Sequence, residues 1–290
     1  MKKDKTPPLL KVVRWIFPKL EVVAPFLAHR YFIKIFFTPL NYQVPEKEKL
    51  VEKQAEKFQV TVAGKRLQCY SWGKGPVVLL AHGWAGRATQ FRKFIETLTG
   101  EGFRVVGFDG PAHGRSEGKK TNIIEFEEAF RKIYETVGEP QVIIAHSFGG
   151  SAVLHAAMNG LPVKKLINIA SPTIGDEIIN TYLKAIRGSA ATGEFFKSYM
   201  LRKYGKSFDH FTSLHFIRHL RQETDLLLVH DENDKEVSLK HALELKKIYP
   251  TAKLFITKGL GHTRILKDET VISNCVTFIQ NGRLKDQLVS

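Results

Sequence analysis

The sequence is poor in cysteine and has no internal repeat and no low-complexity tract. Its two cysteines, Cys69 and Cys275, lie far apart among 290 residues and in no metal-ligand spacing. A disulfide-rich scaffold, a zinc module and a repeat architecture are therefore excluded. We predict that both cysteines are buried thiols in a reducing compartment, with a disulfide between them as the alternative.

A long charge-free apolar run is also absent. A transmembrane helix needs about 20 mostly apolar residues, but charged side chains interrupt the apolar stretch near the amino terminus. These are Lys11, Arg14, Lys19 and Glu21. No small-residue cleavage site follows, so the stretch does not resemble a signal peptide. Pro18, Pro25 and Pro39 predict that it folds as short helical pieces.

Two interpretations of residues 8–40 remain open. In the first, short helices pack their aromatic side chains onto the main domain or cover the mouth of its site. The aromatic residues concerned are Trp15, Phe17, Phe26, Phe32, Phe36 and Phe37. In the second, the segment is an interfacial anchor whose lysines and arginines face acidic lipid headgroups. We favour packing, because an anchor needs a long helical stripe and the prolines argue against one.

The formal net charge of +15 at pH 7 is the unusual part of the composition. Such a charge fits a nucleic acid, an anionic membrane or an acidic substrate as partner. The lysines and arginines are spread along the chain, however, and neither a basic run nor an RNA-binding signature accompanies them. We therefore expect no nucleic-acid partner and interpret most of the charge as a solvated surface.

From residue 57 onward, short apolar runs alternate with amphipathic stretches. The runs with the composition of strands are residues 57–62, 67–72, 77–82, 104–109, 141–146, 164–171, 225–231 and 252–259. This alternation predicts an α/β fold with a doubly wound, mostly parallel sheet of about eight strands. Residues 173–224 hold helical, aromatic-rich pieces without strands. The predicted domains are a helical extension (1–56), a core (57–172 and 225–290) and an inserted helical cap (173–224).

The sharpest local signal is a serine between a strand and a helix. The strand predicted at residues 141–146 ends, Ser147 follows, and a helical pattern starts at Phe148. Small residues stand on both sides, Ala145 and Gly149, as a sharp turn requires. This pattern resembles the nucleophile elbow G-x-S-x-G of the α/β-hydrolase family, with Ala145 at the first glycine. An ordinary serine N-cap is the alternative interpretation.

Two further strand ends resemble the family's acid and base positions. Residues 230–238 are similar to its pattern H-G-x-x-D-x-x-V-P, which implies Asp234 as the acid, and Asp231, in place of the glycine, is the alternative. Gly261 and His262 resemble the family's final Gly-His, which implies His262 as general base. A serine hydroxyl is a weak nucleophile, so it needs an imidazole to take its proton and a carboxylate to orient that imidazole. The order along the chain is also the family's.

The resemblance further implies an oxyanion hole made by the backbone N–H groups of Trp84 and Phe148. Trp84 belongs to the motif AHGWAG after the third strand, in which His82 is expected to be structural. The motif FDGPAHGRSEG resembles the family's D-x-x-G-H-G-x-S loop. In that loop the resemblance implies a structural role for Asp109 and His113, although the two side chains look like an acid/base pair.

Over roughly residues 57–284, the resemblance implies a serine hydrolase that cleaves a carboxylic ester of a small-molecule substrate through an acyl-enzyme, without metal or cofactor. Thioester, amide and lactone hydrolysis and acyl transfer use the same groups and stay open, as does a non-catalytic binding protein on this scaffold. The aromatic residues of 173–224 either contact an apolar part of the substrate or pack their own core. We expect a cytoplasmic protein, with peripheral contact to the inner face of a membrane through residues 8–40 as the alternative.

Overall fold

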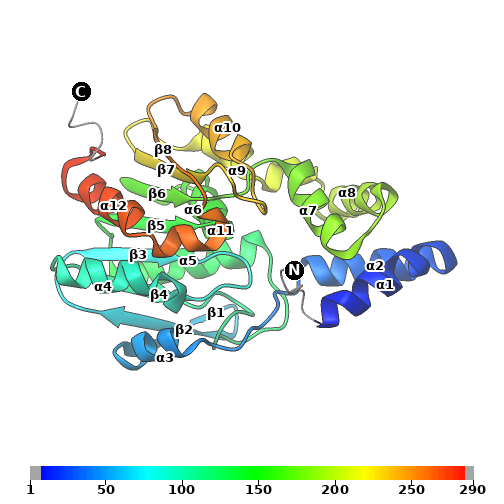
Figure 1. The fold of residues 1–290 in the computed structure, drawn as a ribbon, viewed down its shortest axis with the longest axis horizontal. Coiled ribbons are helices and arrows are strands. Elements are labelled where there is room, and N and C mark those ends of the chain that lie inside the picture. The colour runs from blue at the N-terminus through cyan, green and yellow to red at the C-terminus, as the bar shows by residue number, and fades with distance from the viewer. Residues whose placement is uncertain (1–7, 285–290) are drawn as a thin grey trace. The chain divides into compact units, whose positions relative to one another are not determined.

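An eight-stranded, mostly parallel sheet organises the main part of the chain in the computed structural model, which describes residues 8–284 (Figure 1). Its strands are β1 (Glu56–Val62), β2 (Lys65–Trp72), β3 (Val77–Ala81), β4 (Arg104–Phe108), β5 (Val142–His146), β6 (Lys165–Ile169), β7 (Asp225–Asp231) and β8 (Lys253–Thr257). They lie in the order β1-β2-β4-β3-β5-β6-β7-β8. Strand β2 is antiparallel to β1 and β4, and the other pairs are parallel. The predicted fold and its strands are confirmed.

Helices cover both faces of this sheet. The α-helices of this part of the chain are α3 (Glu46–Lys53), α4 (Arg92–Gly100), α5 (Ile123–Val137), α6 (Phe148–Met158), α9 (Ser213–Phe216), α10 (Lys240–Ile248), α11 (Gly261–Arg264) and α12 (Glu269–Asn281). Because side chains alternate across a strand, neighbouring residues of β4 reach opposite faces. Val105 joins the cluster under α4 and α12, whereas the ring of Phe108 lies 5.5 Å from that of Phe126 in α5.

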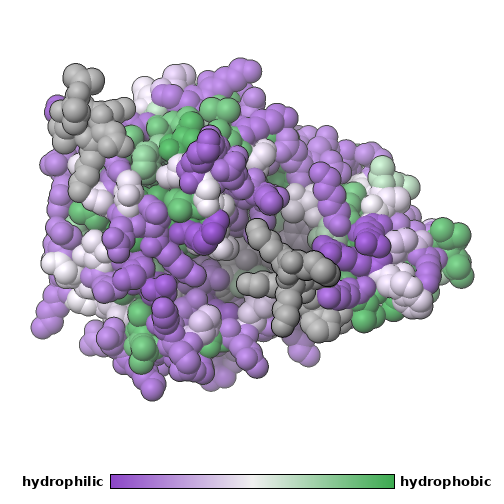
Figure 2. Space-filling model, viewed as in Figure 1, coloured by the Kyte–Doolittle hydropathy of each residue, from purple (hydrophilic) through white to green (hydrophobic). Residues whose placement is uncertain are grey.

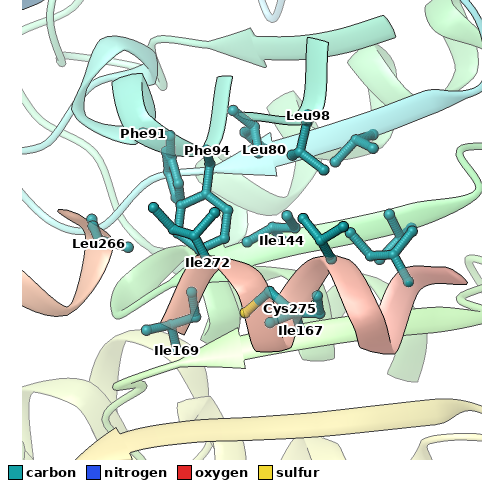
Figure 3. Close-up of a cluster of buried hydrophobic side chains, with 14 of the residues drawn as sticks. Leu80, Phe91, Phe94, Leu98, Ile144, Ile167, Ile169, Leu266, Ile272 and Cys275 are labelled. Carbon is teal, nitrogen blue, oxygen red and sulfur yellow. The ribbon is translucent and has the colours of Figure 1, made fainter. Parts of the chain in front are cut away.

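The face covered by α4 and α12 holds a large apolar cluster (Figure 3). Phe94 and Leu98 of α4 and Ile272 and Cys275 of α12 are buried there against the strands. Cys275 and Cys69 are both free and buried, so the prediction of two unpaired, buried thiols is confirmed. Burial raises the pKa of Cys69 to about 12, so this thiol stays protonated at neutral pH.

The described residues form two compact units, which we call the helical unit (8–38 and 174–212) and the sheet unit (39–173 and 213–284). Their boundaries differ from the predicted ones, and the ends of the predicted extension and core, 1–7 and 285–290, lie outside the described residues. Helix α3 belongs to the sheet unit, because Trp72 Nε1 donates to the carbonyl of Val51 at 2.9 Å. Residues 213–224 belong there too, because Ser213 Oγ donates to Ser151 Oγ of α6 at 2.8 Å.

The helical unit contains α1 (Pro8–Val23), α2 (Pro25–Phe36), α7 (Gly175–Ile186) and α8 (Ala190–Tyr204). The prediction that Pro18 ends a helix is wrong, since α1 runs through it. Pro18 removes one backbone N–H, and burial of the neighbouring Phe17 helps to hold the turn in place. Pro25 lies in the first turn of α2, where a missing N–H leaves no bond unmade.

Aromatic side chains form the core of the helical unit. Its buried rings are Phe17, Phe32, Phe36, Phe196 and Phe208. The rings of Phe36 and Phe196 lie 4.3 Å apart, so aromatic residues of α2 and α8 pack together in the core of their own unit. Trp15 and Phe26 were also expected to pack against the protein, but they are 65% and 63% exposed. Among residues 8–284, no helix has both the length and the apolarity to cross a bilayer.

Candidate active site

Ser147 lies at the sharp turn between β5 and α6. Its backbone adopts φ 52° and ψ −122°, a left-handed conformation that is costly for a residue with a side chain. The turn is held because the Ser147 N–H donates to the carbonyl of Ile169 at 2.8 Å and the Ser147 carbonyl accepts from Gly150 at 2.9 Å. Ser147 occupies the N-cap position of α6, but its side chain makes no capping hydrogen bond, so it is not an ordinary serine cap.

Two glycines permit this turn to lie against β3. A Cβ added at Gly149 would clash with the carbonyl groups of Ala81 and His82, which are backbone atoms that cannot move aside. A Cβ added at Gly83 would lie 2.9 Å from Cβ of Ser147. The loop after β3 therefore runs directly beside the serine, and both positions require glycine.

His262 connects Ser147 to Asp234. Its Nε2 lies 3.0 Å from Ser147 Oγ, and its Nδ1 lies 2.7 Å from Oδ2 of Asp234. A carboxylate only accepts hydrogen bonds, so Nδ1 carries the proton and Nε2 presents its lone pair to the serine hydroxyl. The three side chains come from the turn after β5, the loop after β7 and α11, which follows β8. Because these strands are parallel, their carboxyl ends lie at one edge of the sheet.

The carboxylate of Asp234 is fully buried and held by hydrogen bonds. Its Oδ1 accepts from the backbone N–H groups of Glu236 and Val237, at 2.8 and 3.0 Å. Burial alone would raise the pKa of Asp234, but the hydrogen bond and charge of His262 and the two backbone N–H groups outweigh it and lower the pKa. Asp234 is therefore ionised at neutral pH and can stabilise a positive imidazole.

Asp231, the alternative acid, has a different set of partners. Its carboxylate accepts from the backbone N–H groups of Asn233 and Leu260 and from the hydroxyl of Thr257, at 2.8 to 3.0 Å. It thus ties the end of β7 to the loop that leads into α11. The structure brings Asp234 rather than Asp231 to His262, and Asp231 fastens the loop that carries the histidine.

The amide of Phe148 directly follows Ser147 in the chain, and the amide of Trp84 follows Gly83, which lies against the Ser147 side chain. The Gly83 carbonyl accepts from Nδ1 of His82 at 2.7 Å and from the N–H of Gly86 at 2.9 Å. The Gly83 carbonyl and the Trp84 N–H belong to the same peptide bond, and in a trans peptide they point in opposite directions. The Trp84 N–H therefore points away from the groups of His82 and Gly86 that donate to this carbonyl. Phe148 is the first residue of α6, where the N–H has no intrahelical acceptor. Among residues 8–284, neither amide donates to a protein acceptor.

The other histidines of the sequence motifs hold loops. His82 Nε2 accepts from the N–H of Gly110 at 2.9 Å, and His113 Nδ1 lies 2.9 Å from the carbonyl of Pro111. Asp109 accepts from Tyr70, Ala88 and Arg115 rather than from a histidine. Burial lowers the pKa of His113 to about 4, and burial also lowers the pKa of His82 well below its usual value. Both are neutral at pH 7, in agreement with the structural roles expected from the sequence.

Sequence reasoning missed His146, the last residue of β5. Its Nε2 donates to the backbone carbonyl of His262 at 2.9 Å, and the two rings lie 4.8 Å apart. Burial, followed by the nearby charge of His262, lowers the pKa of His146 to about 3, so it is a neutral donor. The sequence did hold a signal for it, since a titratable residue ends a buried strand directly before the serine. His146 therefore positions the backbone that carries the His262 ring.

We expect His146→Phe to lower kcat by about 10- to 100-fold, because a small displacement of the His262 ring weakens proton transfer. We expect KM to change by less than about threefold, since His146 is buried and its side chain contacts the His262 backbone. His146→Gln keeps a donor at the place of Nε2 and should restore most of kcat. Steady-state kinetics on an activated ester measure both variants, and equal losses for Phe and Gln would contradict the positioning role.

Comparison with known families gives two matches along the chain. A model described as alpha/beta hydrolase fold matches residues 76–185, and a model described as TAP-like protein matches residues 211–289. Together the two matched segments cover more than half of the chain. They include Ser147, Asp234 and His262.

Curated relatives match over shorter stretches. A monoacylglycerol lipase of Mycolicibacterium smegmatis is 33% identical over 85 residues, which are 27% of this chain and 30% of the relative. A pimeloyl-[acyl-carrier protein] methyl ester esterase of Vibrio campbellii is 30% identical over 106 residues, 36% of this chain and 41% of the relative. The aligned stretches thus span less than half of either relative.

Solved structures match over most of the chain at low identity. An esterase from Pyrococcus furiosus aligns with a TM-score of 0.64 at 17% identity, over 84% of this chain and 97% of its own. Mouse alpha/beta hydrolase domain-containing protein 10 aligns with a TM-score of 0.57 at 19% identity, over 81% and 100%. The sheet order and these matches define the α/β-hydrolase fold. The chain belongs to the α/β-hydrolase family.

Proposed function

We propose that this protein is a serine hydrolase that cleaves carboxylic esters through an acyl-enzyme, with Ser147, His262 and Asp234 as its catalytic triad. The single observation that carries the proposal is the continuous line of hydrogen bonds, 3.0 Å from Ser147 to His262 and 2.7 Å from His262 to Asp234. The length of both contacts permits proton transfer without rearrangement.

In the first half of the reaction, Ser147 Oγ attacks the acyl carbon and its proton passes to Nε2 of His262. The imidazolium so formed is stabilised by the ionised Asp234. The backbone N–H groups of Trp84 and Phe148 bind the negative oxygen of the tetrahedral intermediate. The intermediate collapses, the bond to the alcohol oxygen breaks, and this oxygen takes the proton from Nε2.

In the second half, a water molecule takes the place of the alcohol and gives a proton to Nε2 of His262. Its oxygen attacks the acyl carbon, and the bond to Ser147 Oγ then breaks as Nε2 returns the proton to the serine. The acid leaves and the enzyme is restored. No step requires a metal or cofactor, and Asp234 remains ionised throughout.

The ester class is supported by the relatives, one named a monoacylglycerol lipase and the other a methyl ester esterase. Thioesters and acyl transfer would use the same line of groups. No contact among residues 8–284 favours them over ester hydrolysis.

A panel of p-nitrophenyl esters of increasing acyl length, with a matched thioester and anilide, tests this proposal. We expect release of p-nitrophenolate from the esters, slower turnover of the anilide, and stoichiometric labelling by a fluorophosphonate, because an activated serine attacks phosphorus as it attacks an acyl carbon. A folded protein, verified by circular dichroism, that neither turns over any ester nor takes up the label would contradict the proposal and favour a non-catalytic binding protein.

A further inference from the structure

The outer face of α1 is apolar although it packs against nothing in the helical unit. Val12, Trp15, Ile16, Val22 and Val23 are all exposed, Val22 and Val23 at 83% and 84%. Their spacing of three, four and seven residues places them on one side of the helix. The opposite side carries Phe17, which is buried in the core of the unit. Helix α1 is therefore apolar on two sides, and only one of them is used for packing.

The same apolar surface continues into α2. Phe26 and Leu27, in the first turn of this helix, are 63% and 55% exposed. Figure 2 shows apolar residues gathered at the tip where α1 ends and α2 begins in Figure 1. We call Val12, Trp15, Ile16, Val22, Val23, Phe26 and Leu27 together the exposed apolar face. Large contiguous patches of this kind on a soluble unit mark a surface that binds something.

The charges on and beside this face are positive. Lys19 Nζ lies 3.3 Å from the centroid of the Trp15 ring, and the guanidinium of Arg30 lies 5.6 Å from that of Phe26. Within the described residues, neither of these cations pairs with a carboxylate, and Lys34 does not either. Cations that lie over exposed aromatic rings match the headgroup region of a bilayer, where rings sit at the apolar boundary and cations reach phosphates.

The one acidic residue of α1 and α2, Glu21, is directed elsewhere. Its carboxylate accepts from the N–H and the hydroxyl of Ser189, at 2.9 and 2.7 Å, and from Thr192 Oγ1 at 2.6 Å. It therefore caps the start of α8 and does not neutralise Lys19 or Arg30. Within α1 and α2, the free charges beside the exposed apolar face are therefore positive, and we call them its positive rim.

We propose that the exposed apolar face binds the surface of a bilayer that contains anionic lipid, with α1 lying in the interface plane. At 16 residues, α1 is about 24 Å long, which is too short to span a bilayer but suits an interfacial helix. A second copy of this chain is the less suitable occupant, because pairing of identical faces would bring the positive rims together. The proposal is independent of the catalytic one.

Vesicle flotation of the full chain tests this proposal. At about 0.1 M salt, we expect the protein to float with phosphatidylcholine vesicles that contain about 30% phosphatidylglycerol and to remain largely in the dense fraction with pure phosphatidylcholine. The double variant Val23→Asp/Phe26→Asp should bind about tenfold less, because it removes apolar area and adds charge that anionic headgroups repel. Substitution is preferable to deletion, since α1 and α2 also supply the buried core of the helical unit.

The matched control is Leu50→Asp/Leu243→Asp, which places the same change at two exposed leucines of the sheet unit. It should float like the unchanged protein. Trp15 provides a second measurement, because it is the exposed tryptophan of the chain, whereas Trp72 is buried and Trp84 is half-buried. The fluorescence of Trp15 should shift to the blue with anionic vesicles, and Trp15→Phe should lose that shift while still floating.

Three results would overturn the proposal. They are that the unchanged protein stays in the dense fraction with anionic vesicles, that it floats equally with neutral ones, or that the Val23→Asp/Phe26→Asp variant floats as well as the control. If sedimentation finds a dimer that this variant dissociates while neither protein floats, the face is a contact between two copies and the bilayer proposal is wrong. Because flotation needs no turnover, failure of the catalytic proposal would leave these outcomes readable.

Discussion

Ser147→Ala is expected to lower kcat for p-nitrophenyl ester hydrolysis by roughly 10⁴-fold or more and to abolish fluorophosphonate labelling. The substitution removes the hydroxyl oxygen that lies 3.0 Å from His262 Nε2 and that is proposed to form the acyl-enzyme. Residual turnover would come from the amides of Trp84 and Phe148 and from substrate binding. An assay of p-nitrophenolate release measures kcat, and intact-mass measurement of the same sample measures fluorophosphonate labelling.

Ser151→Ala is the matched control for this variant. Ser151 is a buried serine in α6, the helix that follows Ser147, and its hydroxyl donates to the carbonyl of Pro172 at 3.1 Å rather than to a histidine. It should keep the fluorophosphonate label and lie within about tenfold of the unchanged rate. If Ser147→Ala still took up the label while Ser151→Ala lost it, the nucleophile assignment would be wrong.

Asp234→Asn is expected to lower kcat by roughly 10³- to 10⁴-fold, with a smaller change in KM. An amide can donate to Nδ1 of His262, which would place the proton on Nε2 and leave no lone pair for the serine hydroxyl. It also removes the charge that stabilises the imidazolium. Because the pKa of Asp234 is lowered, its carboxylate stays ionised across the neutral pH range and becomes protonated only in acid. The loss of kcat in the variant should therefore persist throughout the neutral range.

Asp231→Asn should affect stability more than chemistry. Its carboxylate accepts hydrogen bonds from Thr257 and Leu260, and it has no contact with the ring of His262. We expect a lower melting temperature and less than about a 30-fold loss in kcat, because the loop that carries His262 becomes looser. Equal or reversed losses in the two aspartate variants would assign the acid to Asp231 instead.

Local pattern was enough to predict the sheet and the places where the site residues lie. Strand β5 is continuously apolar from Val142 to Ala145 because it is buried on both faces, and such runs can be recognised without an alignment. The carboxyl ends of parallel strands meet at one edge, so residues that follow β5, β7 and β8 were expected to converge. Their distances could not be predicted, because they depend on loop conformation.

The amino-terminal segment was harder to predict, because a proline inside a helix usually ends it. The expected break at Pro18 led to the inference that no long stripe exists. In the structure, tertiary packing of Phe17 accompanies a continuous α1, and the stripe from Val12 to Val23 becomes visible. Tertiary contacts also explain why the boundaries of the two units differ from those of the predicted domains. Helix α3 is polar in sequence, yet Val51 and Glu52 anchor it to the sheet unit.

The sequence by itself determined the order of strands and helices along the chain, the turn at Ser147 and the residues that could serve as acid and base. These depend on hydrophobic period and on small residues at fixed spacing, which are local properties. Only the tertiary structure showed that Asp234 rather than Asp231 contacts the His262 ring, that His146 contacts the His262 backbone, and that α1 has a packed and an exposed side. Each of these choices depends on which atoms meet across more than 20 residues of chain, and no local pattern encodes such a meeting.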